Sequence, residues 1–473
     1  MNGKSVTNMT TGSPAKHILK FALPLLLGNL FQQFYNMVDS IVVGNHEGAD
    51  ALAAVGTCGS TNFLFFSLSS GLAIGIGVIV SQFFGAGDEK RVRATIANSL
   101  YVLVFAALTV SIIGYLAAPT VLKFLNVDET IIQDSIIYMR TTCIGIVGIA
   151  LYNGVSAILR ALGDSRTPLI FLALSSVINV VLDLVFVLNL GLGVFGVALA
   201  TIIAQAVSAI GCILYAYYSI PYFKLTIREM KPDARIILQS FRLGVPIALQ
   251  SSMIAVSCMV LQGVVNNFGK TVMAAYTITA RIEQLVQQPY MSLASAVTTY
   301  SGQNIGAGKI DRVKQGFKES VLIVLCFSIL MIPVMYLGGE SIVRLFCKNN
   351  PDVLMIAKKA LRITSLCYFG LGMIYMPRGL MNGCGDAAFS MINGISEVAC
   401  RVIFAKVFTS IASIGFWGVW LTTGATWTVT AGVCMIRYFQ GVWQHKKVTR
   451  VGDKDTTSEV ASEASGTLPV SGK

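Results

Sequence analysis

The sequence predicts an all-α polytopic membrane protein, with about twelve transmembrane helices in two homologous six-helix bundles around a central cavity. Composition, the spacing of apolar runs and an internal duplication support this fold class. Of the 473 residues, 54% are hydrophobic and only 12% are charged, and the mean hydropathy is +0.70. Soluble domains carry roughly 25% charged residues, so this composition indicates a chain that is largely in lipid.

Apolar runs of roughly 20 residues recur along the chain, and each is long enough to cross a bilayer as a helix. The expected spans are 18–44, 53–82, 95–118, 136–159, 169–189, 194–218, 240–266, 273–301, 319–338, 361–382, 389–412 and 416–438. This spacing predicts five parts: an N-terminal cytoplasmic segment 1–17, a bundle 18–218, a cytoplasmic linker 219–239, a bundle 240–445 and a disordered cytoplasmic tail 446–473.

The chain repeats one template at an offset of 221 or 222 residues. Pro24 is matched by Pro246, and the pair Gly163-Asp164 returns as Gly385-Asp386. The longest repeat is Gln82-Phe83-Phe84-Gly85-Ala86-Gly87, which returns as Gln303-Asn304-Ile305-Gly306-Ala307-Gly308. Duplication within a very apolar chain is typical of secondary transporters, in which two bundles rock around a central site.

The net charge of +12 follows the membrane topology and does not indicate nucleic-acid binding. With these spans, the clusters of Lys and Arg fall on one side, at 16–20, 90–93, 160–166, 224–235, 309–318 and 446–450. The positive-inside rule therefore places both termini in the cytoplasm. The stretch 340–359 is an exception, because its four basic residues fall on the outer side.

Polar side chains enter the first, fourth, fifth and sixth spans. A carboxylate at mid-membrane costs about 2.5–3.5 kcal/mol, so each needs an explanation. One face of the first span carries Asn29, Gln32, Asn36 and Asp39, and one face of the fifth carries Ser175, Asn179 and Asp183. The fourth span adds Asn153, and the sixth adds Thr201 and Gln205.

These groups predict an ion-coupling chamber in the first six helices. Asp39 and Asp183 have no basic residue within two helical turns in sequence. Burial without a cationic partner raises a carboxyl pKa toward neutrality, which suits reversible protonation. The same oxygens, with Asn36, Asn179 and Thr201, are alternatively ligands for Na⁺. For the neutral amides Asn29, Gln32, Asn153 and Gln205, hydrogen bonding between helices is an equal alternative.

The second half has lost this acidic site. At an offset of 222, Asn179 corresponds to Arg401 and Asp183 to Ala405. Glu397 and Arg401 stand one turn apart, a spacing typical of a self-neutralising structural pair. Candidates for the substrate cavity are Gln32, Tyr35, Tyr276, Glu283 and Gln284, with Glu283 placed to meet a cationic substrate.

Proline and glycine positions add two further expectations. Pro24 and Pro246 fall early in their spans, where a proline frees a carbonyl and permits bending. We expect them to act as hinges, with a static kink as the alternative. Gly71, Gly75 and Gly77 are most simply a face for close helix packing.

Together these motifs resemble the multidrug and toxic compound extrusion (MATE) family, in its DNA-damage-inducible-F-like bacterial branch. The resemblance covers residues 14–445. It is carried by Phe21-Ala22-Leu23-Pro24, Asn36-Met37-Val38-Asp39, Ala51-Leu52-Ala53-Ala54-Val55-Gly56, Gln82 to Gly87, Leu159-Arg160-Ala161-Leu162-Gly163-Asp164 and Asn179-Val180-Val181-Leu182-Asp183.

The resemblance implies a V-shaped exporter of organic cations and amphipathic drugs, driven by inward H⁺ or Na⁺. Asp39, Asn179 and Asp183 match positions that bind the coupling ion, and Asn153 and Thr201 match supporting positions. The seventh and tenth spans lack the acids of another branch, which favours an ion site in the first half. We expect no cofactor, a monomer in the lipid bilayer of a bacterial inner membrane, and no nucleic-acid partner.

Other functions are weighed against this one. A flippase for lipid-linked precursors shares the two-bundle design, but a cation-lined cavity is expected for it. An exporter of a single physiological metabolite remains an alternative. An intramembrane enzyme is not favoured, because no HExxH or GxSG motif occurs within the spans. A passive channel has no need of a duplicated, asymmetric site.

Overall fold

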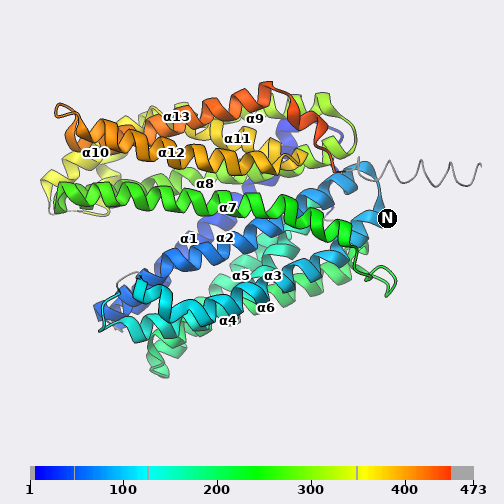
Figure 1. Ribbon diagram of the computed structural model, residues 1–473, viewed down its shortest axis with the longest axis horizontal. Helices are drawn as coiled ribbons and strands as arrows, with labels where there is room; N and C mark the ends of the chain where they lie inside the picture. Colours follow the sequence, from blue (N-terminus) through cyan, green and yellow to red (C-terminus); the bar gives the residue numbers. More distant parts are fainter. Residues whose placement is uncertain (1–5, 47, 125–126, 348–349, 449–473) are drawn as a thin grey trace, which may run out of the picture.

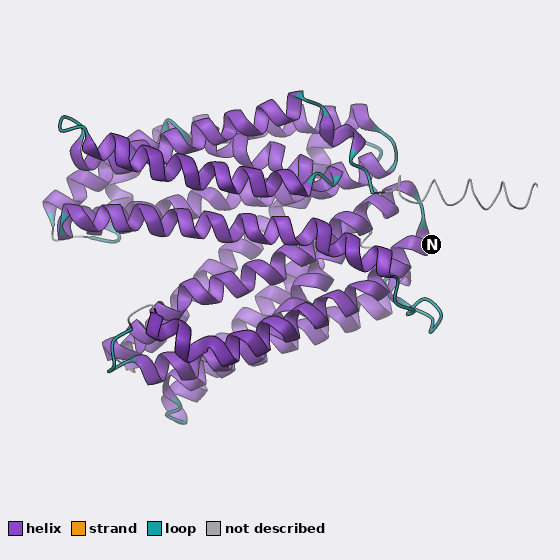
Figure 2. Cartoon of the chain, in the orientation of Figure 1, coloured by secondary structure: helices purple, strands orange, loops and turns teal. Residues whose placement is uncertain are grey.

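The computed structural model describes residues 6–46, 48–124, 127–347 and 350–448. The side chains of residues 35, 36, 38–49, 52 and 60 lie outside this description. Within the described residues the chain is almost entirely helical and contains no strand (Figure 2). The all-α prediction is therefore confirmed.

The N-terminal half has six long helices that match the six predicted spans. The fifth is followed directly by a π-helix, η1 (Leu184–Asn189). The long helices are α1 (Pro14–His46), α2 (Gly48–Ala86), α3 (Glu89–Phe124), α4 (Ile132–Ala161), α5 (Arg166–Asp183) and α6 (Gly193–Ser219).

The C-terminal half has seven α-helices, because one predicted span is divided. They are α7 (Ala234–Val265), α8 (Lys270–Gly306), α9 (Ile310–Arg344), α10 (Pro351–Ser365), α11 (Tyr368–Cys384), α12 (Ala387–Ser410) and α13 (Gly418–Phe439). Among the described residues, nine helical stretches are long and apolar enough to cross a membrane. The chain is a multi-pass membrane protein.

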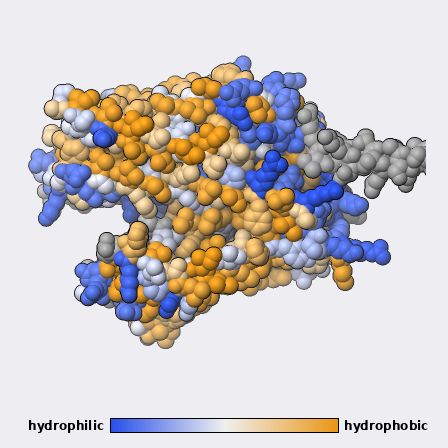
Figure 3. All heavy atoms as spheres, in the orientation of Figure 1, coloured by the Kyte–Doolittle hydropathy of each residue, from blue (hydrophilic) through white to orange (hydrophobic). Residues whose placement is uncertain are grey.

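The two halves form the arms of a V (Figure 1). Helices α2 to α6 lie in one arm and α7 to α13 in the other, and α1 lies against both α5 and α8. The arms meet near the N terminus, where α2 and α8 end, and we call this the closed end. At the opposite end they diverge, and Figure 3 shows a hollow between them.

Small residues let the two arms approach closely where α2 crosses α7. A Cβ atom added to Gly75 would lie 2.7 Å from the backbone nitrogen of Gly244. One added to Gly71 would lie 2.5 Å from the nitrogen of Ala248. Gly77 instead faces Ala157 of α4, within its own arm. The predicted close packing is confirmed for all three glycines, but on two faces: Gly71 and Gly75 hold the two arms together, and Gly77 packs within one arm.

The stretch between α9 and α11 differs from the prediction. The span expected at 361–382 is divided between α10 and α11, and much of 340–359 is helical. Asn350 caps α10 by accepting a hydrogen bond from the Val353 nitrogen at 3.2 Å, and Pro351 occupies the first turn, where it needs no hydrogen bond.

The basic residues of this stretch are partly neutralised at the same place. The Glu340 carboxylate accepts bonds from Arg344 at 2.8 Å and from Lys358 at 2.6 Å. The exception to the one-sided charge pattern is thus a local ion-pair cluster that joins α9 to α10. Such exposed pairs contribute little to stability, about 0–1 kcal/mol each.

The linker between the halves packs on the start of α3. Arg93 pairs with Glu229 at 2.6 Å, and the Tyr101 hydroxyl donates to the Met230 carbonyl at 2.6 Å. The backbone and hydroxyl hydrogen bonds that Thr226 donates to Glu229 lower the pKa of that carboxyl. This carboxylate therefore stays ionised at neutral pH and ties the linker to the N-terminal arm.

Candidate functional site

The face of α5 that points into the N-terminal arm carries three buried polar side chains. Ser175, Asn179 and Asp183 follow one another at intervals of four residues, and their exposed fractions are 3%, 2% and 0%. Residues at this spacing lie on one side of a helix. An otherwise apolar helix thus presents an acid, an amide and a hydroxyl to the protein interior, as the sequence predicts.

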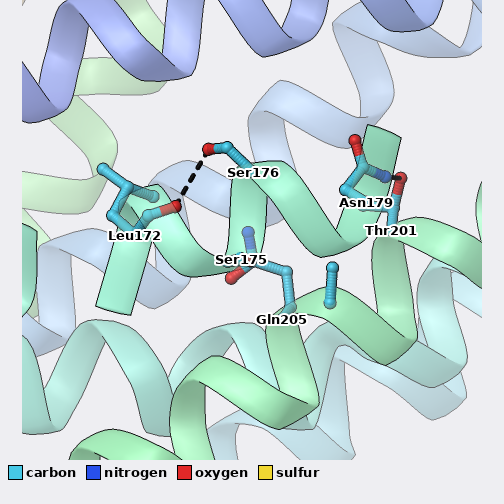
Figure 4. A pocket seen from close by; sticks show the side chains of 7 residues that line it. Leu172, Ser175, Ser176, Asn179, Thr201 and Gln205 are labelled. Carbon is cyan, nitrogen blue, oxygen red and sulfur yellow. Dashed lines mark hydrogen bonds between the residues drawn. The ribbon is translucent and has the colours of Figure 1, made fainter. Parts of the chain in front are cut away.

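Helix α6 completes a small chamber against this face. The Asn179 side-chain nitrogen donates to the Thr201 hydroxyl oxygen at 3.4 Å (Figure 4). The Thr201 hydroxyl in turn donates to the Val197 carbonyl at 3.1 Å. The chamber has a volume of about 10 Å³, roughly one water-sized sphere. Its lining residues are Leu172, Ser175, Ser176, Asn179, Thr201, Ala204 and Gln205.

One atom in this chamber lacks a partner in the described part of the chain. The side-chain oxygen of Asn179 is buried and accepts no hydrogen bond. Burying a hydrogen-bond acceptor without a donor costs free energy, and water molecules or cations bind to such atoms. The chamber therefore presents an oxygen suited to a small cation, and none of its lining residues is basic.

Asp183 is the last residue of α5, and the π-helix η1 begins immediately after it. Single π-turns within helices are rare and often occur at functional sites. The sequence carries no signal of this turn, because the residues Leu184–Asn189 are as apolar as an ordinary transmembrane helix. The irregular backbone begins directly after Asp183, one of the two carboxylates with a predicted role in ion coupling.

The other predicted ion-site residues lie on α1 and α4. Asn153 is half-buried on α4, and its side-chain nitrogen donates to no partner among the described atoms. Helix α4 packs against α6 and α5, so Asn153 belongs to the same arm. The side chains of Tyr35, Asn36 and Asp39 lie outside the described residues, and their roles stay predictions.

Of the remaining polar residues of the first helix, Asn29 bonds to the C-terminal arm. Asn29 donates to the Ser292 hydroxyl of α8 at 3.1 Å, which is a bond between helices of the kind weighed for this residue. Gln32 is half-buried. Pro24 and Pro246 both lie inside continuous helices, α1 and α7, and their hinge roles stay predictions.

The C-terminal arm holds an ion pair at the positions equivalent to Ser175 and Asn179. Glu397 and Arg401 pair at 3.1 Å, and each residue is only 5% exposed. Arg401 also donates to the Cys258 sulfur at 3.2 Å. The predicted self-neutralising pair is confirmed, so the two arms are chemically different at matching places.

The substrate-cavity candidates on α8 occupy different environments. Glu283 is 9% exposed, and both Glu283 and Tyr276 lie within electrostatic range of Arg401. Tyr276 also packs its ring at a tilt against Trp420. Gln284 is exposed. Their contact with a substrate stays a prediction.

Replacing one partner of the Glu397–Arg401 pair is expected to destabilise the protein more than replacing both partners. Glu397→Ala leaves a buried guanidinium uncompensated, at a cost of about 3–5 kcal/mol, whereas the double variant Glu397→Met/Arg401→Met is expected near wild type. Thermal unfolding in detergent measures both. Glu340→Ala, at an exposed ion pair, is the control with an expected cost of about 0–1 kcal/mol. Equal losses for Glu397→Ala and Glu340→Ala would contradict the prediction.

Comparison with known proteins places these features in a family. The MatE family model matches the chain twice, at residues 24–185 and 246–407. The probable multidrug resistance protein YoeA of Bacillus subtilis is 28% identical over 439 residues, which cover 91% of this chain and 94% of that protein. The probable multidrug resistance protein NorM of Thermotoga maritima is 24% identical over 438 residues, 92% of this chain and 94% of that protein.

Solved structures share the fold. A MOP-superfamily transporter from Pyrococcus furiosus superposes with a TM-score of 0.87 at 24% identity, over 95% of this chain and all of that one. The outward-facing form of a multidrug resistance MATE transporter gives a TM-score of 0.87 at 24% identity, over 94% of this chain and 99% of that one. The V with two arms is therefore a known architecture.

Proposed function

Because this chain belongs to the MATE family of transporters, which the family model matches in both halves, we propose that it is a multidrug antiporter. In this proposal it exports organic cations and amphipathic compounds in exchange for inward H⁺ or Na⁺. The observation that carries the proposal is the buried chamber of the N-terminal arm, with Asn179 and Thr201 in contact and Asp183 one turn beyond. The relatives named for multidrug resistance support the substrate class.

The transport cycle follows from the charges of the buried acids and of the substrate. When Asp39 and Asp183 are ionised, the N-terminal arm carries negative charge, and the hollow between the two arms binds a cationic substrate. Entry of H⁺ or Na⁺ neutralises the acids and lowers the affinity for that substrate. The oxygens of Asn179, Thr201 and Asp183 are of the type that hard cations prefer. Coupling requires that substrate and ion favour opposite conformations.

We further propose that the protein lies in a bacterial inner membrane with both termini in the cytoplasm. The closed end then faces the cytoplasm and the open end of the V faces outward. Each positive charge that moves inward gains about 2.3 kcal/mol per 100 mV of membrane potential. This electrical gain drives export of a neutral substrate. For a monovalent cation exchanged one for one the two charges cancel, and the concentration gradient of H⁺ or Na⁺ drives export instead.

The test is dye export from proteoliposomes in which the orientation of the protein in the membrane is known. Efflux of a cationic dye is measured under a pH gradient and separately under a Na⁺ gradient, for wild type and Asp39→Asn. Asp128→Asn, in the exposed loop before α4, is the control. We expect one gradient to drive efflux, Asp39→Asn to abolish it and Asp128→Asn to leave it unchanged. Dye that moves under neither gradient would overturn the proposal and favour a lipid-linked or single-metabolite substrate.

A further inference from the structure

Two glutamines at the closed end make crossed hydrogen bonds between the arms. The side-chain nitrogen of Gln82, on α2, donates to the Gly383 carbonyl of α11 at 2.8 Å. The side-chain nitrogen of Gln303, on α8, donates to the Ala161 carbonyl of α4 at 2.9 Å. Both glutamines are completely buried. The two bonds are equivalent under the internal repeat, and each crosses from one arm to the other.

The side-chain oxygens of the same glutamines hold the two terminal segments. Gln303 accepts from the Met9 backbone nitrogen at 2.8 Å, and Gln82 accepts from the Val448 backbone nitrogen at 2.7 Å. Each glutamine therefore uses both ends of its amide on the opposite half of the chain. A buried amide with both ends satisfied is strongly oriented, because either loss leaves an unpaired polar group.

The N-terminal segment is fixed to both arms. Its Thr7 nitrogen donates to the Leu162 carbonyl at 3.1 Å. Leu162 directly follows Ala161, whose carbonyl accepts the bond from Gln303. On the other arm, Lys309 donates to the Thr10 carbonyl at 2.9 Å and Arg312 to the Gly12 carbonyl at 3.0 Å. The segment 7–12 thus runs across the junction as a strap.

The C-terminal segment lies at the equivalent place. Val448 is 4% exposed, and the Lys446 carbonyl lies against Gly385, where an added Cβ would be 2.7 Å away. Gly163 is similarly close to the Thr7 carbonyl, and both glycines have positive φ, +88° and +92° for Gly163 and Gly385. Glycine at these two repeated positions leaves space for the two straps. Residues 449–473 lie outside the described chain.

The crossed bonds lie beside a close backbone contact between the arms. A Cβ at Gly85 would lie 2.6 Å from the Gln303 carbonyl carbon, and one at Gly306 would lie 2.7 Å from that of Gln82. Any separation of the two arms at this end therefore lengthens the crossed bonds. The crossed hydrogen bonds form only when the two arms are in contact at the closed end.

We propose that Gln82 and Gln303, with the straps 7–12 and 446–448, form a latch that sets how often the closed end opens. This rests on the proposed transport cycle, in which that end must open once per turnover. Among the described residues, the hydrogen bonds of the latch glutamines go to Gly383, Val448, Ala161 and Met9 and to no residue of the ion site, so we assign them an effect on the conformational equilibrium. Removing one of them is expected to raise the ratio of open to closed molecules roughly tenfold.

The test is a distance measurement that needs no substrate. Spin labels at Lys90→Cys and Asp311→Cys, exposed at the starts of α3 and α9, report the separation of the arms at the closed end. They are introduced after replacement of the exposed cysteines Cys258 and Cys326. Gln82→Met and Gln303→Met remove the amides at similar volume, and Gln133→Met, at an exposed position on α4, is the control.

We expect a longer distance to gain population in each latch variant, more in the double variant, and no change in Gln133→Met. Met9→Pro removes the backbone donor to Gln303 together with the buried Met9 side chain, and Met9→Ala removes the side chain alone. The shift in Met9→Pro beyond that in Met9→Ala should not add to the shift in Gln303→Met. Unchanged distances in folded Gln82→Met and Gln303→Met would overturn the latch. If one variant does not fold, the other and Met9→Pro still decide. Shifted distances in a protein that exports no dye would leave the latch standing and remove the proposed function.

Discussion

Asp183→Asn is expected to lower gradient-driven efflux by about 10- to 100-fold, the range that allosteric coupling energies span. The side chain is completely buried at the end of α5, immediately before the π-helix. Asparagine keeps the volume of the side chain but neither ionises nor releases a proton. The variant therefore holds the arm in its neutralised form, in which the exchange of ion and substrate is uncoupled.

Two measurements separate this effect from misfolding. Thermal unfolding should remain within about 1 kcal/mol of wild type, because a neutral amide costs less to bury than a carboxylate. Substrate binding should become insensitive to pH or to Na⁺, whichever ion drives transport. Asp128→Asn, in the exposed loop, provides the matched substitution. Efflux by Asp183→Asn at the wild-type rate would show that coupling lies elsewhere.

Gly85→Ala is expected to prevent the closed end from forming, although it adds one methyl group. Alanine gains about 1 kcal/mol of helix propensity over glycine. Against that gain, the new methyl would overlap the backbone of Gln303, 2.6 Å away at its carbonyl carbon. Overpacking typically costs about 1–3 kcal/mol, and a backbone contact relaxes less than a side chain. The clash should exceed the gain, with export reduced at least tenfold.

Gly59→Ala is the matched control, because it makes the same change on the same helix. An added Cβ at Gly59 meets no atom within 4 Å. We expect it to be neutral or slightly stabilising in a thermal unfolding assay and to export normally. The same loss in both variants would mean that helix α2 tolerates no alanine, and the contact with Gln303 would not be the cause.

Most of the architecture was predictable because it depends on local apolarity. Twelve apolar runs place twelve spans, and the repeats of Pro24 and of Gln82 predict two related halves. The division at Leu366–Cys367 was not predictable in this way, since the run 361–382 is continuous in hydropathy. The stretch 340–359 lay between two predicted spans, although Asn350 and Pro351 mark the start of a helix within it. The pairing of Lys358 with Glu340 joins two helices, and the sequence alone does not indicate it.

The site was predictable to the level of single helices. Spacing of four residues groups Ser175, Asn179 and Asp183, and the structure places Thr201 beside Asn179. The π-helix carries no compositional signal. The Gln82 and Gln303 repeat was evident in the sequence, but its contacts join residues more than 140 positions apart. Only the packed arms show which carbonyl each amide meets.

The crossed bonds of the closed end have the form of an isologous dimer interface. In such an interface residue i of one copy meets residue j of the other, and j meets i in return. Here Gln82 meets Gly383 while Gln303 meets Ala161, the same pair of positions exchanged between two copies now joined in one polypeptide. A fused dimer is free to specialise wherever the two copies do not touch. The chemical difference between Asn179 and Arg401 lies within the arms, where symmetry imposes no constraint.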